Sequence, residues 1–213
     1  MISTIFFQYA QQDLTSYIED DKDTTSYNYQ NTQGVLSYLS LMPHYQNDSI
    51  TDYFTEEILD QNDNLWLKTN AVIARIKSNL SIQNDVLDSL YQNTTSRFDV
   101  MKAYYDVGKI FKIPKVFLEK ENFAKLSIEN YMESIVEYGY TISLLGNIEI
   151  DGEIYIGASA KYLGEENESK SYTLAVGPIY NPTEKQDLLL YEVTTDWTET
   201  SDNWESQVTS MLK

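Results

Sequence analysis

The chain contains no cysteine in its 213 residues. This absence excludes disulfides, thiolate metal sites, iron–sulfur clusters and cysteine nucleophiles. It also allows a reducing compartment. Residues 1–7 have neither a basic start nor a small-residue cleavage site, so no signal peptide is predicted and we expect a cytoplasmic protein.

Long apolar runs are also missing. A membrane-spanning helix needs roughly 18 or more consecutive apolar residues, and no segment approaches that length. Anionic lipid surfaces repel a strongly acidic protein, so we expect no membrane partner.

Histidine occurs once, and the familiar catalytic motifs are absent. There is no glycine-rich phosphate loop, dinucleotide fingerprint, Gly-x-Ser-x-Gly elbow or His-Glu-x-x-His pair. The single histidine, His44, follows Pro43 and is read as a surface or packing residue. The sequence thus identifies no reaction, and no cofactor, metal site or catalytic residue is predicted.

Basic residues are few and unevenly placed. Residues 1–64 contain 11 acidic and 1 basic residue, residues 65–130 contain 7 and 10, and residues 131–213 contain 15 and 4. The net charge is −18. Such a surface repels polyanions and attracts cationic proteins, so a basic protein surface is the expected partner rather than nucleic acid.

The hydrophobic pattern changes period along the chain. Helical spacing over much of residues 35–138 predicts a mainly helical region, residues 1–138, with a mobile acidic loop near residues 19–34. Residues 139–213 are expected to form an antiparallel sheet and a terminal helix, either as a second domain or as part of one continuous domain. The fold class expected is therefore α+β, with an N-terminal helical region, a four-stranded antiparallel meander and a C-terminal helix.

The meander rests on a hairpin signal. Asp151-Gly152 between two apolar runs favours a tight turn with positive φ angles. Two further strands are expected over residues 172–179 and 188–193.

An acidic stripe is the main candidate binding site. If a helix beginning at Ser49 continues far enough, four carboxylates share one face, opposite Tyr53, Phe54 and Ile58: Asp52, Glu56, Asp60 and Asp63. Their spacing of about 5–6 Å approaches that of phosphates on a nucleic-acid strand. Tyr27 and Tyr29 in the predicted loop are added as contact residues because tyrosine is enriched at interfaces.

The central bases have two interpretations. They are interspersed with acidic residues, so pairing with the acidic ends of the chain or of a second copy is favoured over nucleic-acid binding; the set is Arg97, Lys102, Lys109, Lys112, Lys115, Lys120 and Lys125.

One weak enzyme signal is present. Asp151 followed by Glu168-x-Lys170 resembles the two carboxylates and lysine of metal-dependent nucleases, although both groups fall at predicted turns in an acidic region.

The leading hypothesis is a non-catalytic inhibitor that binds a basic protein surface, in its most specific form a nucleic-acid mimic that blocks the groove of a nuclease or defence complex. Three alternatives stay open: a toxin-neutralising immunity protein, a metal-dependent hydrolase or nuclease, and a structural or assembly subunit. A homo-oligomer is compatible with the sequence.

Overall fold

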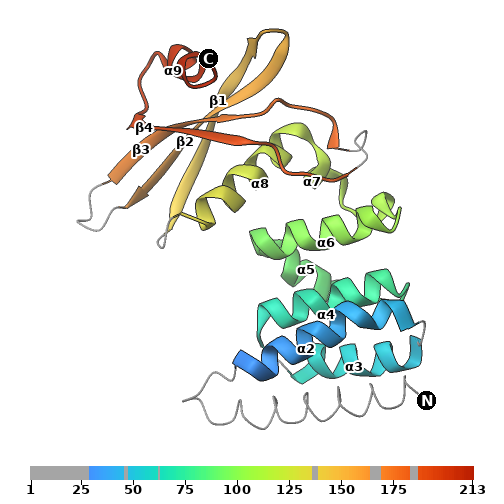
Figure 1. The fold of residues 1–213 in the computed structure, drawn as a ribbon. Coiled ribbons are helices and arrows are strands. Elements are labelled where there is room, and N and C mark those ends of the chain that lie inside the picture. Colours follow the sequence, from blue (N-terminus) through green and yellow to red (C-terminus); the bar gives the residue numbers. More distant parts are fainter. Residues whose placement is uncertain (1–28, 46–47, 62, 136–138, 164–168, 183–186) are drawn as a thin grey trace. The chain divides into compact units, whose positions relative to one another are not determined.

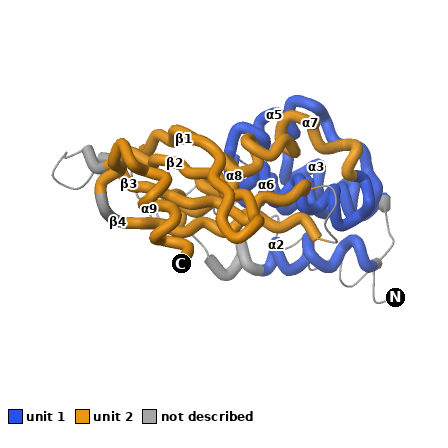
Figure 2. Tube along the Cα trace, turned by 90° about the horizontal axis from the view of Figure 1, so that it is seen from above, with its two compact units in different colours: residues 1–109 blue, residues 110–213 orange. Residues whose placement is uncertain are grey.

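The α+β fold class predicted from the sequence is confirmed. The computed structural model describes residues 29–45, 48–61, 63–135, 139–163, 169–182 and 187–213 (Figure 1). These residues contain eight α-helices, two short 3-10 helices and a four-stranded antiparallel sheet. The chain divides into two compact units, residues 1–109 and residues 110–213 (Figure 2).

Unit 1 is helical in its described part. Its elements are α2 (Tyr29–Leu41), η1 (Met42–Tyr45), α3 (Asp48–Gln61), α4 (Leu65–Lys77), α5 (Asn84–Gln92) and α6 (Thr94–Asp106). The core between α2, α3 and α4 buries apolar side chains from all three helices; among them are Val35, Leu39, Phe54, Ile58, Leu67 and Ala71. Burial of this kind contributes about 25 cal/mol per Å² of apolar surface, so it fixes which face of each helix is hidden.

The loop predicted near residues 19–34 is wrong for residues 29–34. These residues form the first part of α2, while residues 19–28 lie outside the described residues. The reason is the buried series Val35, Leu39 and Met42, whose spacing of four and three residues places one apolar stripe on the core. Tertiary packing thus draws polar residues upstream of Val35 into the same helix.

Unit 2 builds the sheet. Its elements are η2 (Ile110–Lys112), α7 (Lys115–Leu118), α8 (Lys120–Glu133), β1 (Tyr140–Ile150), β2 (Glu153–Leu163), β3 (Ser169–Val176), β4 (Val193–Glu199) and α9 (Trp204–Met211). The strand order is β1-β2-β3-β4, which is the expected meander. The Asp151-Gly152 turn forms as predicted, with φ angles of 53° and 83°.

The two helices α8 and α9 cover opposite faces of this sheet (Figure 1). On the α9 face, the Trp204 ring lies so close to Gly157 that a Cβ there would be 2.3 Å from its Cζ3 atom. On the α8 face, the Thr195 hydroxyl donates to the Tyr131 hydroxyl at 2.9 Å. Because neighbouring residues of a strand point to opposite faces, Gly157 lies on the α9 face and Ala158 lies on the α8 face.

The fourth strand differs from its prediction. Residues 188–192 are not in a strand, and β4 begins at Val193. Leu188 and Tyr191 are nevertheless buried. The Tyr191 backbone N–H donates to Ser127 Oγ of α8 at 3.0 Å, so a helix side chain replaces a strand partner.

The two compact units meet in sequence at Lys109 and Ile110. The boundary suggested by the sequence, at residues 138 and 139, follows the change from helix to strand instead. The difference arises because α8 packs on the sheet, so it belongs to the same unit as the strands.

Candidate protein-binding face

The buried face of α3 is not the one that its hydrophobic residues suggest. The buried side chains are Thr51, Phe54, Thr55 and Ile58. Tyr53, which the sequence places on the inner side, is 47% exposed. The prediction for Tyr53 is therefore wrong, because two threonines occupy the positions at helical spacing from Phe54 and Ile58.

Thr55 tolerates burial because its hydroxyl is fully used. The hydroxyl donates to the Thr51 carbonyl oxygen at 2.6 Å and accepts from Arg75 Nη1 at 2.9 Å. A buried polar group with such partners avoids the cost of desolvation without compensation. The polar residues Thr51 and Thr55 thus turn α3 so that Tyr53 faces outward.

With this rotation, α3 presents one acidic side. At about 100° per residue, its outer residues occupy an arc of about 140° centred opposite the buried residues. We call this set the acidic face of α3: Asp52, Tyr53, Glu56, Glu57 and Asp60. The helix carries five acidic residues and no basic one, whereas α4, which packs against it, carries three basic residues and no acidic one.

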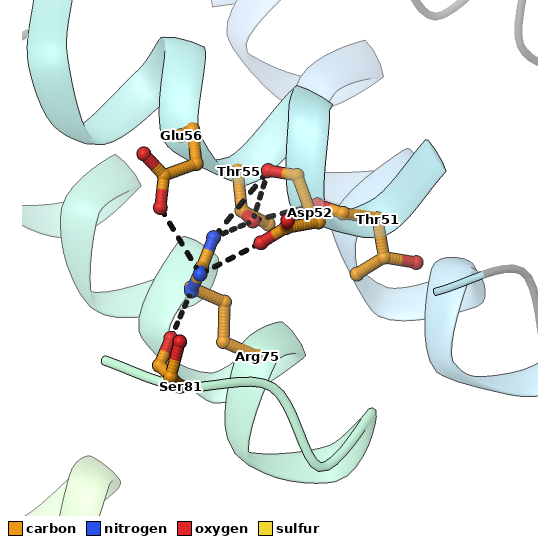
Figure 3. A network of polar contacts seen from close by, with 6 residues as sticks. All are labelled: Thr51, Asp52, Thr55, Glu56, Arg75 and Ser81. Carbon is orange, nitrogen blue, oxygen red and sulfur yellow. Dashed lines mark hydrogen bonds and ion pairs between the residues drawn. The ribbon is translucent and has the colours of Figure 1, made fainter. Parts of the chain in front are cut away.

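Arg75 of α4 joins the acidic face to the interior. Its Nη2 atom lies 2.8 Å from Asp52 Oδ1 and 3.1 Å from Glu56 Oε1, and its Nε donates to the Ser81 carbonyl oxygen at 2.7 Å (Figure 3). Arg75 is only 2% exposed. The guanidinium thus connects α3, α4 and the segment before α5. It can do so because a guanidinium holds several N–H donors in one fixed plane.

The two carboxylates remain accessible from outside. The side chains of Asp52 and Glu56 are 52% and 43% exposed, and their ion pairs with Arg75 each use one carboxylate oxygen. In Figure 3 the second oxygen of Glu56 points away from Arg75. Arg75 therefore holds both groups in fixed positions while it reduces their combined charge from −2 to −1.

The remaining predicted contact residues are distributed differently. Asp60 is exposed on α3. Asp63 is also exposed, but α3 ends at Gln61, so Asp63 does not continue the helical stripe. Tyr27 lies outside the described residues, and Tyr29 is the first residue of α2 with a side chain that is not described.

Three of the central bases have partners within unit 1. Lys102 pairs with Asp106 at 3.0 Å, one helical turn away. Arg97 Nε donates to the Tyr91 carbonyl oxygen at 2.8 Å, and Lys109 Nζ donates to Asn79 Oδ1 at 2.5 Å. Lys112, Lys115, Lys120 and Lys125 are exposed in unit 2.

The group behind the enzyme alternative is only partly described. Asp151 is exposed at the turn, Glu168 lies outside the described residues, and Lys170 lies in β3. Within the described part of the chain, no three acidic or histidine side chains are grouped so that they could hold a metal ion. Likewise, none of the helices described has both the length and the apolar character needed to cross a membrane.

Arg75 is the site residue that sequence reasoning missed. A signal for it exists, since Arg75 follows Leu67 and Ala71 at intervals of eight and four residues on the apolar side of α4. A charged residue at such a position requires a buried partner, because an unpaired buried charge is very costly.

Comparisons with known proteins add no relative. No protein-family model, no curated protein and no solved structure matches this chain.

Proposed function

We propose that this protein is a non-catalytic cytoplasmic binding protein whose acidic face of α3 docks on a basic surface of another protein. The observation that carries the proposal is an exposed tyrosine, Tyr53, among four carboxylates on one side of a helix. Tyrosine gives a large contact area at low entropic cost, and the surrounding carboxylates select a cationic partner.

Arg75 supports this proposal because it orders two of the carboxylates before a partner arrives. Immobilising a flexible side chain on binding costs roughly 0.5–1.5 kcal/mol. Asp52 and Glu56 are already fixed by the buried guanidinium. Binding of a partner lysine or arginine to their second carboxylate oxygens therefore costs less side-chain conformational entropy.

A groove that normally holds nucleic acid, as in a nuclease or defence complex, is the more specific form of this partner. The structure supports a nucleic-acid-binding groove as the partner less strongly than it supports a basic protein surface in general. Arg75 neutralises part of the stripe, and Asp63 lies beyond the end of α3. We therefore propose a basic protein surface and treat the nucleic-acid groove as a case for experiment.

The test is affinity capture from a lysate of the source organism with four tagged proteins. These are the wild type, Tyr53→Ala, Asp60→Lys and the control Asp88→Lys. Asp88 is an exposed acid on α5, so its reversal changes the net charge as Asp60→Lys does without altering α3. Captured proteins are eluted at increasing salt and identified by mass spectrometry.

We expect one basic protein to be retained by the wild type and by Asp88→Lys, and to elute as the salt concentration rises. Tyr53→Ala and Asp60→Lys should each weaken its binding by about tenfold, corresponding to about 1.4 kcal/mol. Equal loss in Asp60→Lys and Asp88→Lys would show that total charge, and not the acidic face of α3, determines binding. If DNA displaces the captured protein, the partner surface is a nucleic-acid groove.

A further inference from the structure

The outer edge of β1 is long and carries little charge. β1 has 11 residues, of which only Glu149 is charged, and none is proline. It pairs with β2 on one side. Among the described residues, no other backbone–backbone hydrogen bond involves residues 141–150. The outer N–H and C=O groups of β1 therefore form a template for one more strand.

The opposite edge of the sheet is built differently. β4 has seven residues and includes two acids, Asp196 and Glu199. Charged residues and short length are common ways in which edge strands are protected from pairing. A β-bulge also disfavours pairing at an edge, and β1 has a bulge between Leu144 and Gly146. Beyond the bulge, Gly146–Ile150 pairs with β2 in regular register up to the turn.

Acidic groups surround this end of β1. Asp151 and Glu153 follow Glu149 at the turn, and the Tyr155 hydroxyl donates to Glu153 Oε2 at 2.9 Å. This hydrogen bond raises the pKa of Tyr155, and the nearby charges of Glu192 and Asp151 add to the effect. Glu149, Asp151 and Glu153 thus bring three carboxylates to the turn end of β1.

The side chains of Gly146–Ile150 alternate in character. Ile148 and Ile150 pack with Val208 and Trp204 on the α9 face, whereas Asn147 and Glu149 are exposed on the other face. A strand placed beside them would have apolar residues next to the isoleucines and basic residues next to Glu149. A second copy of this chain would bring further negative charge, since unit 2 contains 18 acidic and 8 basic residues.

We propose that the outer edge of Gly146–Ile150 binds an extended basic segment, with alternating apolar and Lys or Arg residues, as an added β-strand. Main-chain hydrogen bonds would supply affinity, and the alternation of side chains would supply specificity. This interaction lies in unit 2 and does not depend on the proposed role of α3.

The test uses a fluorescent peptide with the sequence Lys-Val-Lys-Val-Lys-Val-Lys and the full-length protein. Two modified peptides are compared with it, one N-methylated at every valine and the other at every lysine after the first residue. Because the N–H groups of a strand point alternately toward and away from its neighbour, only one of the two methylation patterns faces β1. Binding is followed by fluorescence anisotropy, and the site is located from the backbone NMR shifts of Gly146–Ile150.

Two protein variants separate edge pairing from general charge attraction. Glu149→Lys reverses the charge beside the edge, and Glu199→Lys makes the same change on β4. We expect Glu149→Lys to weaken the parent peptide about fivefold and Glu199→Lys to change it less than twofold. One methylated peptide should bind like the parent, and the other should lose binding.

Several results would overturn the proposal. These are failure of the parent peptide to bind, equal binding of all three peptides, and shifts that fall outside Gly146–Ile150. Dimerisation of the protein, detected by sedimentation and accompanied by concentration-dependent NMR shifts of Gly146–Ile150, would assign the edge to a second copy instead. Asp60→Lys should bind the peptide as the wild type does, so the result is independent of the capture experiment.

Discussion

At the scale of single residues, Arg75 makes several polar contacts with α3 and with the segment before α5. It ties Asp52, Glu56 and Thr55 of α3 to the Ser81 carbonyl oxygen, and it is almost completely buried. Its two acidic partners are about half exposed, so they keep much of their hydration. The two carboxylates therefore escape much of the desolvation penalty of a fully buried pair, and the hydrogen bonds and ion pairs of the guanidinium offset its own burial.

Replacing Arg75 by methionine should lower the free energy of unfolding by about 2 kcal/mol, because several charge-assisted hydrogen bonds are lost and methionine fills the space. Urea unfolding followed by circular dichroism measures the change. Lys77→Met is the matched control, since Lys77 is exposed in the same helix and its replacement removes the same charge. Equal effects of the two variants would contradict a structural role for the Arg75 contacts.

Gly157 has a steric role at the contact between β2 and α9. A Cβ at this position would lie 2.3 Å from Trp204 Cζ3, so Gly157→Ala must displace the indole or bend β2. We expect a loss of about 2 kcal/mol in the free energy of unfolding, as in other overpacked cores. Gly139→Ala provides the control, because a Cβ there meets no atom within 4 Å. Thermal unfolding of both variants decides the question, and a stable Gly157→Ala would show that α9 is not fixed by this contact.

At the scale of elements, helix starts depend on individual side chains. Asn64 Oδ1 accepts hydrogen bonds from the backbone N–H groups of Trp66 and Leu67 at 3.0 and 3.2 Å and caps α4. The first residues of α4 precede the turn that carries Arg75, so the cap helps to define the helix that orders the acidic face of α3.

Asn64→Ala should lower the free energy of unfolding by about 1 kcal/mol, because two N–H groups at the start of α4 lose their acceptor. Gln83→Ala is the comparison, since Gln83 occupies the N-cap position of α5 without a side-chain capping bond. Its effect should stay below about 0.5 kcal/mol. Chemical denaturation of the two variants gives both values, and a larger loss in Gln83→Ala would reverse the assignment.

At the scale of the whole molecule, both compact units contain buried tyrosines whose ionisation opposes folding: Tyr91 and Tyr104 in unit 1 and Tyr191 in unit 2. Burial raises the pKa of Tyr91 in unit 1 well above its ordinary value of 10.0, with smaller contributions from Tyr104 and Asp88. Burial also raises the pKa of Tyr191 in unit 2, with a contribution from Tyr180. The Tyr191 hydroxyl donates to the Tyr180 carbonyl oxygen at 2.6 Å.

Stability should therefore fall as the pH rises above 10. The unfolded chain loses the tyrosine protons near pH 10, whereas the folded protein keeps them to higher pH, so alkaline pH favours the unfolded state. Below pH 10 both states are protonated and this contribution is fully present. Urea unfolding between pH 9 and 11.5 measures the slope.

Tyr91→Phe and Tyr191→Phe should each make this alkaline slope shallower, because neither variant has the corresponding proton to lose. Ultraviolet absorbance of tyrosinate reports ionisation independently. A slope that is unchanged in both variants would assign the alkaline loss to other groups.

The sequence predicted most elements correctly where the pattern was local. The Asp151-Gly152 turn formed because this dipeptide readily adopts positive φ angles, and the four strands have the expected meander order. The fourth strand was misplaced because Leu188 and Tyr191 are buried outside the sheet, with Tyr191 in contact with Ser127 and Phe123 of α8. Hydrophobicity reports burial, and it does not distinguish these two causes.

The candidate site was predicted only in part. The carboxylates Asp52, Glu56 and Asp60 do lie on one side of α3, as their spacing requires. The place of Tyr53 was wrong, because Thr51 and Thr55, and not Tyr53, occupy the buried positions beside Phe54 and Ile58. The role of Arg75 depends on α4 packing against α3, and no local spacing within α3 predicts it.

The sequence by itself determined the acidic charge, the α+β class, the turn between β1 and β2 and the spacing of the α3 carboxylates. These properties depend on composition and on residues that are near neighbours in the chain. Only the tertiary structure decided that Arg75 binds two of those carboxylates, that Tyr53 faces outward, and that β1 is an open edge among the described residues. The physical reason is that burial, ion pairing and strand exposure depend on which segments meet in space.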